Sequence, residues 1–280
     1  MTEEQSAQRT LANRTIIMSG GSRGIGLAIA LRAARDGANV ALLAKTDQPD
    51  PRLEGTIHTA AAEIEEAGGH ALPIVGDVRD DASVADAMAR TVERFGGIDI
   101  VVNNASAIDL SPTSSLSMKK YDLMQDINCR GSFLLAKTAL PHLEQSDAAH
   151  VLTMSPPLNL NPKWAGGHLG YTIAKYGMSL VTLGLAEELR EAGIAANSLW
   201  PRTLIATAAV QNLLGGDTAI QASRSPEIVA DAAYVILTRD PRECTGNFFI
   251  DDEVLREAGM TDLSVYGGTD DQLQKDIFLD

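Results

Sequence analysis

Tyr171 and Lys175 form the pair of side chains with the clearest chemical potential in the sequence. They stand four residues apart in YTIAK, so on a helix both project from one face. A free phenol has a pKa of about 10, too high for a base at neutral pH, but a neighbouring ammonium group favours the phenolate and lowers that pKa. The pair can therefore pass a proton to or from an alcohol or carbonyl oxygen. An amphipathic helix with an incidental tyrosine and lysine is the alternative that this motif leaves open.

A serine stands at the end of an apolar run that is typical of a buried strand. HVLTM leads into Ser155, and Pro156 and Pro157 follow at once. Proline fixes φ and has no amide donor, so the sequence predicts a rigid strand exit that holds the Ser155 hydroxyl in place. The position is either a plain turn or a positioned catalytic group.

A glycine-rich loop, SGGSRGIG at residues 19–26, follows an apolar run and opens a helical pattern. Glycines permit a sharp turn and a close approach of the backbone to a pyrophosphate, whose charge is favoured at a helix N-terminus. The spacing differs from the common Rossmann fingerprint, and a tight turn without a ligand is the alternative. We expect a nucleotide-binding turn formed by Gly20, Gly21, Ser22, Arg23, Gly24, Ile25 and Gly26.

Strand-like and helix-like runs alternate along the chain. Strand alternating with helix implies βαβ units and a parallel sheet. The sequence therefore predicts an α/β fold, with a single Rossmann-type domain built on a doubly wound parallel seven-stranded sheet and helices on both faces. The expected organisation is an N-terminal polar extension at 1–10, the Rossmann-type domain at 11–255 and a C-terminal tail at 256–280. The expected strands lie in the runs 14–20, 39–45, 71–78, 98–105, 150–155, 195–201 and 247–251.

Composition excludes several classes of function. The 23 Lys and Arg residues face 37 Asp and Glu, and the net charge of −14 is opposite to that of a nucleic-acid or anionic-membrane binder. Cys129 and Cys244 are far apart, and no His, Cys, Asp or Glu cluster has metal spacing. No apolar run approaches the roughly 18 residues of a membrane span. We expect a cytoplasmic protein with a small-molecule substrate, no metal, no nucleic-acid partner and no membrane.

The glycine loop, NNA at 103–105 and YTIAK at 171–175 occur in the order seen in short-chain dehydrogenases/reductases, which the chain resembles over about residues 11–255. The resemblance implies an oxidoreductase acting on CH–OH groups. It makes Tyr171 the general acid/base, lets Lys175 also hold the ribose of the cofactor, places Ser155 on the substrate oxygen and has Asn128 link the lysine to a water chain. The resemblance also implies further cofactor-binding residues beyond the glycine loop, namely Asp77, Val78, Asn104, Ala105, Thr207, Tyr171 and Lys175.

The sequence also departs from the family pattern. Pro156 replaces the second of two tandem serines, and Ser155 stands sixteen residues before Tyr171, further than is usual, with Asn159 as a possible replacement donor. NNAS replaces the usual NNAG, so that Ser106 occupies a place normally left bare. After the sixth strand, Arg202 stands where the family has glycine. The family's threonine falls at Ala206, so that either Thr207 or Thr203 could bind the carboxamide of the nicotinamide.

The choice of cofactor can be argued from the end of the second strand. NAD-preferring folds place an acid there to bind the ribose 2′-hydroxyl. Ala44 stands at that position, Lys45 follows it, and Arg23 lies in the glycine loop. Two cations without a carboxylate favour a 2′-phosphate, so NADP(H) is preferred and NAD(H) remains possible. A solvated lysine at a strand end is the alternative for Lys45.

These observations predict an NADP(H)-dependent oxidoreductase that interconverts a secondary alcohol and a ketone. The segment 204–226 is apolar with few charges, which favours a hydrophobic or acyl-type substrate. The alternative is a non-catalytic nucleotide-binding regulatory or scaffold protein on the same fold. The helical run 174–190 is apolar on more than one face, and family members commonly pair through such helices, so we expect a homo-oligomer, a tetramer or a dimer.

Overall fold

Seven parallel strands form one sheet in the order β3-β2-β1-β4-β5-β6-β7. The computed structural model describes residues 10–49, 55–212, 216–269 and 271–280. The predicted fold class and all seven strands are confirmed, whereas the extension predicted at 1–10 lies outside the described residues except for Thr10. The strands are β1 (Thr15–Ser19), β2 (Asn39–Ala44), β3 (His70–Val75), β4 (Ile100–Asn103), β5 (His150–Thr153), β6 (Ala195–Trp200) and β7 (Phe248–Ile250).

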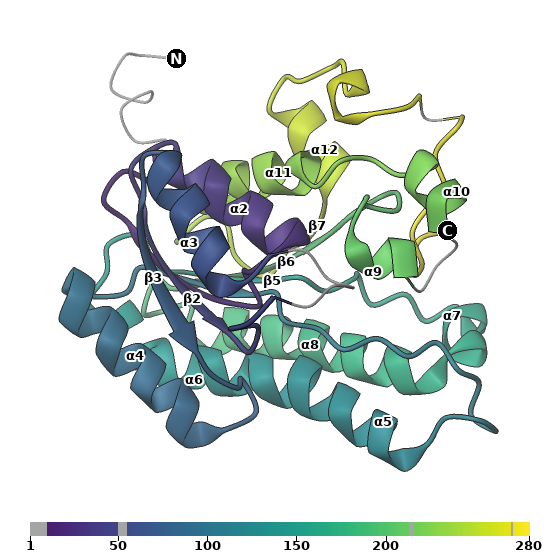
Figure 1. Cartoon of the computed structure of the whole chain (residues 1–280), viewed down its shortest axis with the longest axis horizontal. Coiled ribbons are helices and arrows are strands. Elements are labelled where there is room, and N and C mark those ends of the chain that lie inside the picture. Colours follow the sequence, from purple (N-terminus) through teal and green to yellow (C-terminus); the bar gives the residue numbers. More distant parts are fainter. Residues whose placement is uncertain (1–9, 50–54, 213–215, 270) are drawn as a thin grey trace.

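Helices cover both faces of the sheet (Figure 1). The layer over one face is α2 (Gly24–Ala34), α3 (Ile57–Glu66), α11 (Glu227–Leu237) and α12 (Asp251–Glu257). The opposite layer is α4 (Asp81–Phe95), α6 (Gly131–Leu143) and α8 (Leu169–Glu188). The central strands are buried throughout because both of their faces are covered, which explains their continuous apolar runs. The shorter helical elements are α5 (Met118–Met124), the π-helical turn Gln125–Arg130, α7 (Pro162–Gly167), α9 (Ala208–Val210), α10 (Gly216–Gln221) and a 3₁₀ turn (Ser264–Tyr266).

The chain reverses its direction of travel across the sheet between β1 and β4. Strand β1 pairs with β2 on one side, and on the other side it pairs with β4, which the chain reaches only after β3. In such a sheet a crevice opens beyond the carboxyl ends of the strands at the reversal. The register places Ser19, Asn103 and Thr153 side by side. The glycine loop, the NNA motif and the strand exit at Ser155 therefore begin at one edge of the sheet.

The residues predicted as a C-terminal tail return to this same edge. The chain leaves α12 and comes back to form an antiparallel bridge between Thr203 and Lys275. The Leu204 amide donates to the Gln274 carbonyl at 2.9 Å, and the Asp276 amide donates to the Arg202 carbonyl at 2.9 Å. Residues 271–280, which we call the return segment, therefore lie beside the exit of β6.

Candidate active site

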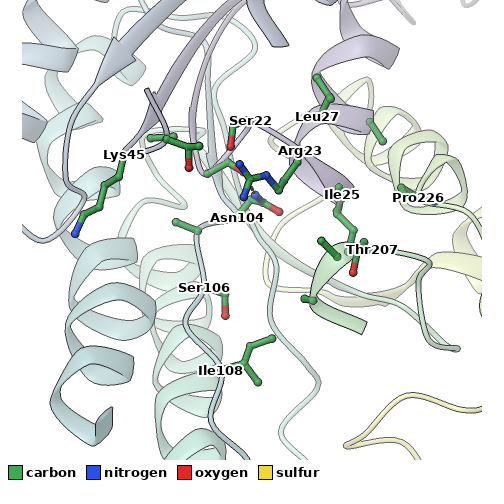
Figure 2. Close-up of a pocket in the computed structure, with 18 of the residues that line it drawn as sticks. Ser22, Arg23, Ile25, Leu27, Lys45, Asn104, Ser106, Ile108, Thr207 and Pro226 are labelled. Atoms are coloured by element: carbon green, nitrogen blue, oxygen red, sulfur yellow. Dashed lines mark hydrogen bonds between the residues drawn. The ribbon is translucent and has the colours of Figure 1, made fainter. Parts of the chain in front are cut away.

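A groove of about 1190 Å³ opens at the carboxyl edge of the sheet (Figure 2). Lys45 lies toward one end of it, Thr207 lies across from Asn104, and Ser106 and Ile108 follow below. The groove gathers segments from β1, β2, β4 and α9 that are far apart in the sequence. The predicted cofactor-binding residues that line it are Gly20, Ser22, Arg23, Gly24, Ile25, Lys45, Asp77, Val78, Asn104, Ala105 and Thr207. Their binding of a cofactor stays a prediction.

The glycine turn packs closely against the exit of β4. Gly20 has a φ of +75°, and a Cβ there would lie 2.9 Å from Ala105 Cα. A Cβ at Gly26 would lie 2.5 Å from Asn104 Nδ2, which donates to the Gly20 carbonyl at 2.7 Å. A Cβ at Gly21 would meet the side chain of a neighbouring strand at 2.5 Å. Glycine is therefore required for packing at Gly26, where a Cβ would also lie 2.7 Å from the Gly20 carbonyl oxygen, and neither Gly21 nor Gly26 lines the groove. The first turn of α2 has no side-chain cap and borders the groove, an arrangement suited to phosphate.

A cluster of charges occupies the groove end at β2. Lys45 Nζ lies 2.6 Å from Asp77 Oδ2, and Arg79 Nη2 donates to the same carboxylate at 2.7 Å. Burial opposes ionisation of Asp77, but the hydrogen bonds from Arg79 and Lys45 outweigh it and hold its pKa well below the usual range. Arg23 Nη2 donates to the Gly55 carbonyl at 2.7 Å. The two predicted cations thus line the groove, with Lys45 already neutralised in part by Asp77.

Tyr171 and Lys175 lie on one face of α8, deep beneath the groove. Their exposed fractions are 4% and 2%. Lys175 Nζ donates to the Met154 carbonyl at 2.6 Å and lies 5.0 Å from the centre of the Trp200 ring. Burial lowers the pKa of Lys175 to about 7, although the negative charge of Asp276 opposes this. Neither residue is among those that line the groove.

The structure corrects the predicted direction of the Tyr171 pKa. Burial, and then the charge of Asp276, raise this pKa well above its usual range, and a hydrogen bond with Ser106 only partly opposes them. The ammonium effect expected from the sequence is outweighed because burial disfavours both charged forms, the phenolate as well as the ammonium of Lys175. The phenol therefore holds its proton in this structure.

Ser155 turns its hydroxyl into the interior. Its Oγ lies 2.7 Å from Ser198 Oγ, its exposed fraction is 0%, and Ser198 Oγ donates to Thr182 Oγ1 at 2.9 Å. The hydroxyl that lowers the Tyr171 pKa belongs instead to Ser106, which the sequence identified only as a departure from NNAG, and the residues after Ser106 pack against the cluster that contains Tyr171. A role for Ser155 at a substrate oxygen stays a prediction, and it requires the Ser155 hydroxyl to leave Ser198.

Asn128 lies in the π-helical turn that joins α5 to α6. Its Oδ1 accepts from the Ala107 amide at 2.7 Å, and its Nδ2 donates to the Ala107 carbonyl at 3.0 Å. π-Helical turns recur at functional sites, and this turn directs the buried side-chain amide of Asn128 toward Ala107, in the segment that follows β4. Asn128 therefore holds the backbone next to Ser106, and its link to a water chain stays a prediction.

The return segment covers Tyr171. Phe278 has an exposed fraction of 0%, and its ring stacks on those of Tyr171 and His168 with centroid distances of 6.2 and 5.6 Å. Trp200 Nε1 donates to the Ile277 carbonyl at 3.0 Å. Asn159, the suggested replacement donor, instead donates to the Phe278 carbonyl at 3.3 Å and to Asp280 at 2.8 Å. Sequence reasoning missed this contact because the polar segment carries no local signal of burial.

The loop after β6 separates the two candidate threonines. Thr207 faces the glycine turn across the groove, where a Cβ at Gly24 would lie 3.3 Å from its methyl group. Thr203 is buried in its bridge to the return segment. Arg202 lies away from the groove, with Nε 2.8 Å from Asp252 Oδ1 on α12. The geometry therefore favours Thr207 over Thr203 as a groove residue.

Among the described residues, no group of three or more His, Cys, Asp or Glu could hold a metal ion. Within the same ranges no helix is both long enough and apolar enough to cross a membrane.

Comparisons with known proteins agree with this arrangement. The family model described as short chain dehydrogenase matches residues 14–215. Hydroxysteroid dehydrogenase-like protein 2 of Danio rerio is 55% identical over 96% of this chain and 65% of its own length, and the Homo sapiens protein of that name is 51% identical over 96% and 64%. The chain thus spans somewhat less than two thirds of these relatives.

Solved structures are similar over nearly the whole chain. A short chain dehydrogenase from Mycobacterium thermoresistibile is 57% identical, with a TM-score of 0.91 over 97% of this chain and 96% of that one. A structure from Xanthomonas campestris is 56% identical, with a TM-score of 0.93 over 97% and 99%. Fold, motifs and relatives together place this chain in the short-chain dehydrogenase family.

Proposed function

We propose that the protein is an NADP(H)-dependent oxidoreductase that interconverts a secondary alcohol and a ketone. The observation that carries the proposal is the position of Tyr171, one helical turn from Lys175 on α8 and next to the chain of Ser106, a serine that lines the groove. The names of the relatives refer to hydroxysteroids, which are hydrophobic alcohols. This supports a hydrophobic or acyl-type substrate, as do Ile108, Ile127 and Ile220 on the groove wall.

The chemistry follows from the state of the Tyr171 phenol. A bound nicotinamide supplies a hydride in reduction and accepts one in oxidation. In ketone reduction Tyr171 donates its proton to the carbonyl oxygen, and in alcohol oxidation the phenolate takes that proton back. A raised pKa keeps the proton on Tyr171 near neutral pH, which favours the reductive direction. Lys175 stands one turn away, and its pKa of about 7 leaves its ammonium form present in part at neutral pH, where it favours the phenolate that arises when Tyr171 gives up its proton.

A second candidate function is a non-catalytic nucleotide-binding protein. The observation that favours it is the cover of Phe278 over Tyr171, which leaves the phenol 4% exposed. In this role the groove binds the nucleotide and the return segment stays closed. The two candidates differ in turnover and agree in nucleotide binding.

Asp276 adds to the effect of burial on the pH range in which Tyr171 ionises. It lies deep in the molecule, although part of its surface stays accessible, and burial raises its own pKa to about 7. Its negative charge raises the pKa of both Tyr171 and Lys175. The effect is therefore present above about pH 7 and disappears as Asp276 takes up a proton at lower pH.

We also propose a homo-oligomer, a tetramer or a dimer, and a cytoplasmic location. Large apolar side chains project into solvent from neighbouring helices α6 and α8, which supports an interface there. They are Phe133, Ile173, Leu180 and Leu183, with exposed fractions of 49%, 43%, 57% and 45%.

The change Tyr171→Phe tests the proposed reaction. We expect turnover of ketones with NADPH to be nearly abolished, because the proton donor is lost, while calorimetric NADPH affinity stays the same. The assay follows nicotinamide absorbance with aromatic ketones, aliphatic ketones and 3-oxoacyl thioesters. Wild-type protein that binds NADPH and turns over none of these probes would support the non-catalytic candidate.

The change Lys45→Ala tests the preference for NADP(H). We expect NADPH affinity to fall about tenfold or more while NADH affinity changes little, because a charge-assisted contact of about 1.5–3 kcal/mol is lost and Asp77 is left to repel the phosphate. Lys119→Ala, an exposed lysine on α5, is the matched control. Wild-type binding of NADH as tight as that of NADPH would contradict the preference.

The change Asp276→Asn tests the pH dependence. Removal of the negative charge lowers the pKa of Tyr171, so the midpoint of alcohol oxidation should move to lower pH while rates below about pH 7 stay close to those of the wild type. Asp271→Asn, in the exposed part of the return segment, is the control. A midpoint that stays in place or moves to higher pH would show that Asp276 does not act on Tyr171.

The double change of Leu180 and Leu183 to Asp tests the interface. Sedimentation at micromolar concentration should show a dimer or tetramer for the wild type and a smaller species for the variant, because buried charges oppose association. Val265→Asp, an exposed apolar residue elsewhere, should leave the assembly unchanged. A monomeric wild type would rule out the proposed assembly.

A further inference from the structure

The single proton of the Ser155 hydroxyl is already committed to the protein interior. Thr182 Oγ1 donates to the Met178 carbonyl at 3.4 Å, and Ser198 Oγ donates to Thr182 Oγ1 at 2.9 Å. A hydroxyl has one proton to donate, so the proton between Ser155 and Ser198, at 2.7 Å, comes from Ser155. All three hydroxyl-bearing residues are fully buried. Ser155 therefore has no proton left for a substrate oxygen unless this chain of hydrogen bonds breaks.

Ser106 has the properties that Ser155 lacks. It is exposed and lines the groove, where Figure 2 shows it between Asn104 and Ile108. The two residues after it, Ala107 and Ile108, pack against the cluster that contains Tyr171, and the Ser106 hydroxyl acts on the Tyr171 phenol. Ser106 therefore places a hydroxyl where the groove and the phenol meet. Ser155 is not among the residues that line the groove.

The backbone on both sides of Ser106 is anchored. Before it, the amides of Asn104 and Ala105 donate to Ser19 Oγ at 3.2 and 3.1 Å. After it, Ala107 is bonded through both its amide and its carbonyl to Asn128. A donor held in this way is preorganised, which is the condition for strong stabilisation of a developing charge.

We propose that Ser106, in place of Ser155, is the hydroxyl that binds the substrate oxygen together with Tyr171. The inference deepens the proposed alcohol–ketone reaction and rests on it. In reduction the carbonyl oxygen gains negative charge as the hydride reaches the carbonyl carbon. The Tyr171 proton moves to that oxygen, while Ser106 donates a hydrogen bond and keeps its own proton.

Turnover by variants gives the first test. Ser106→Ala should lower kcat with aromatic and aliphatic ketones on the order of a hundredfold, as loss of one such donor does, while NADPH affinity is unchanged. Ser106→Thr keeps a hydroxyl and should retain much of the activity. Ser106→Gly, the residue usual in the family, should repeat the loss if the alanine variant folds poorly. Ser114→Ala, an exposed serine beyond the groove, is the matched control.

The comparison with Ser155 decides between the two hydroxyls. Ser155→Ala should lower the melting temperature, because it leaves buried groups unpaired, and should reduce kcat far less than Ser106→Ala does. A severe loss of kcat in Ser155→Ala together with a silent Ser106→Ala would overturn the assignment.

A binding measurement separates this inference from the proposed reaction. Protein saturated with NADPH cannot oxidise an added alcohol, so the quenching of NADPH fluorescence by 1-phenylethanol and 2-octanol reports alcohol binding without turnover, and the difference between variants reports the contact with the alcohol oxygen. We expect Ser106→Ala to weaken this binding about tenfold, which corresponds to one hydrogen bond, and Ser155→Ala to leave it unchanged. If the protein turns over no ketone but binds the alcohols, and Ser106→Ala weakens that binding, the result would count against the reaction and support the assignment. Binding that is insensitive to Ser106, or no binding to the wild type, would overturn the assignment.

Discussion

The close approach of the exits of β1 and β4 is the constraint on which the site depends. Gly20 and Ala105 are so near that no side chain fits between them, and Asn104 Nδ2 bonds the Gly20 carbonyl at 2.7 Å. Ser19 Oγ joins the same junction by accepting two amides of the β4 exit. On one side of the junction the glycine turn opens α2 toward the groove, and on the other side the chain runs into Ser106. One junction therefore sets the distance between the glycine turn and the hydroxyls that would meet a substrate.

Burial controls the charge state of the groups beneath that junction. Tyr171, Lys175 and Asp276 lie deep in the molecule, and the charged form of each is disfavoured there. Asp251 belongs to the same buried surroundings, where burial raises its pKa to about 6. Lys175, Asp276 and Asp251 would therefore change charge near neutral pH, whereas Tyr171 keeps its proton there, as suits a proton donor.

The return segment maintains this dry environment at a local cost. Phe278 has a φ of +74°, a left-handed conformation that is unfavourable for a bulky residue by about 1–3 kcal/mol. Burial of its ring against Tyr171, His168 and Trp200 contributes about 2–3 kcal/mol, enough to offset the strain. Strain of this kind persists where the surroundings hold it in place, and it recurs at ligand sites. The cover over Tyr171 is thus a packed part of the fold.

The sequence by itself determined the sheet, the glycine turn and the pairing of Tyr171 with Lys175. These features are local, because strand periodicity, glycine spacing and a four-residue helical separation can be read without knowing what packs against them. Tertiary structure decided which serine hydroxyl acts on Tyr171, since Ser106 and Ser155 leave different strands and the direction of each hydroxyl depends on neighbours distant in sequence. It also decided the ionisation of Tyr171, because Asp276 and Phe278 reach it only when the chain returns from beyond α12. Burial and Coulomb interactions depend on distance in space, and the polar sequence of the return segment gives no sign of that distance.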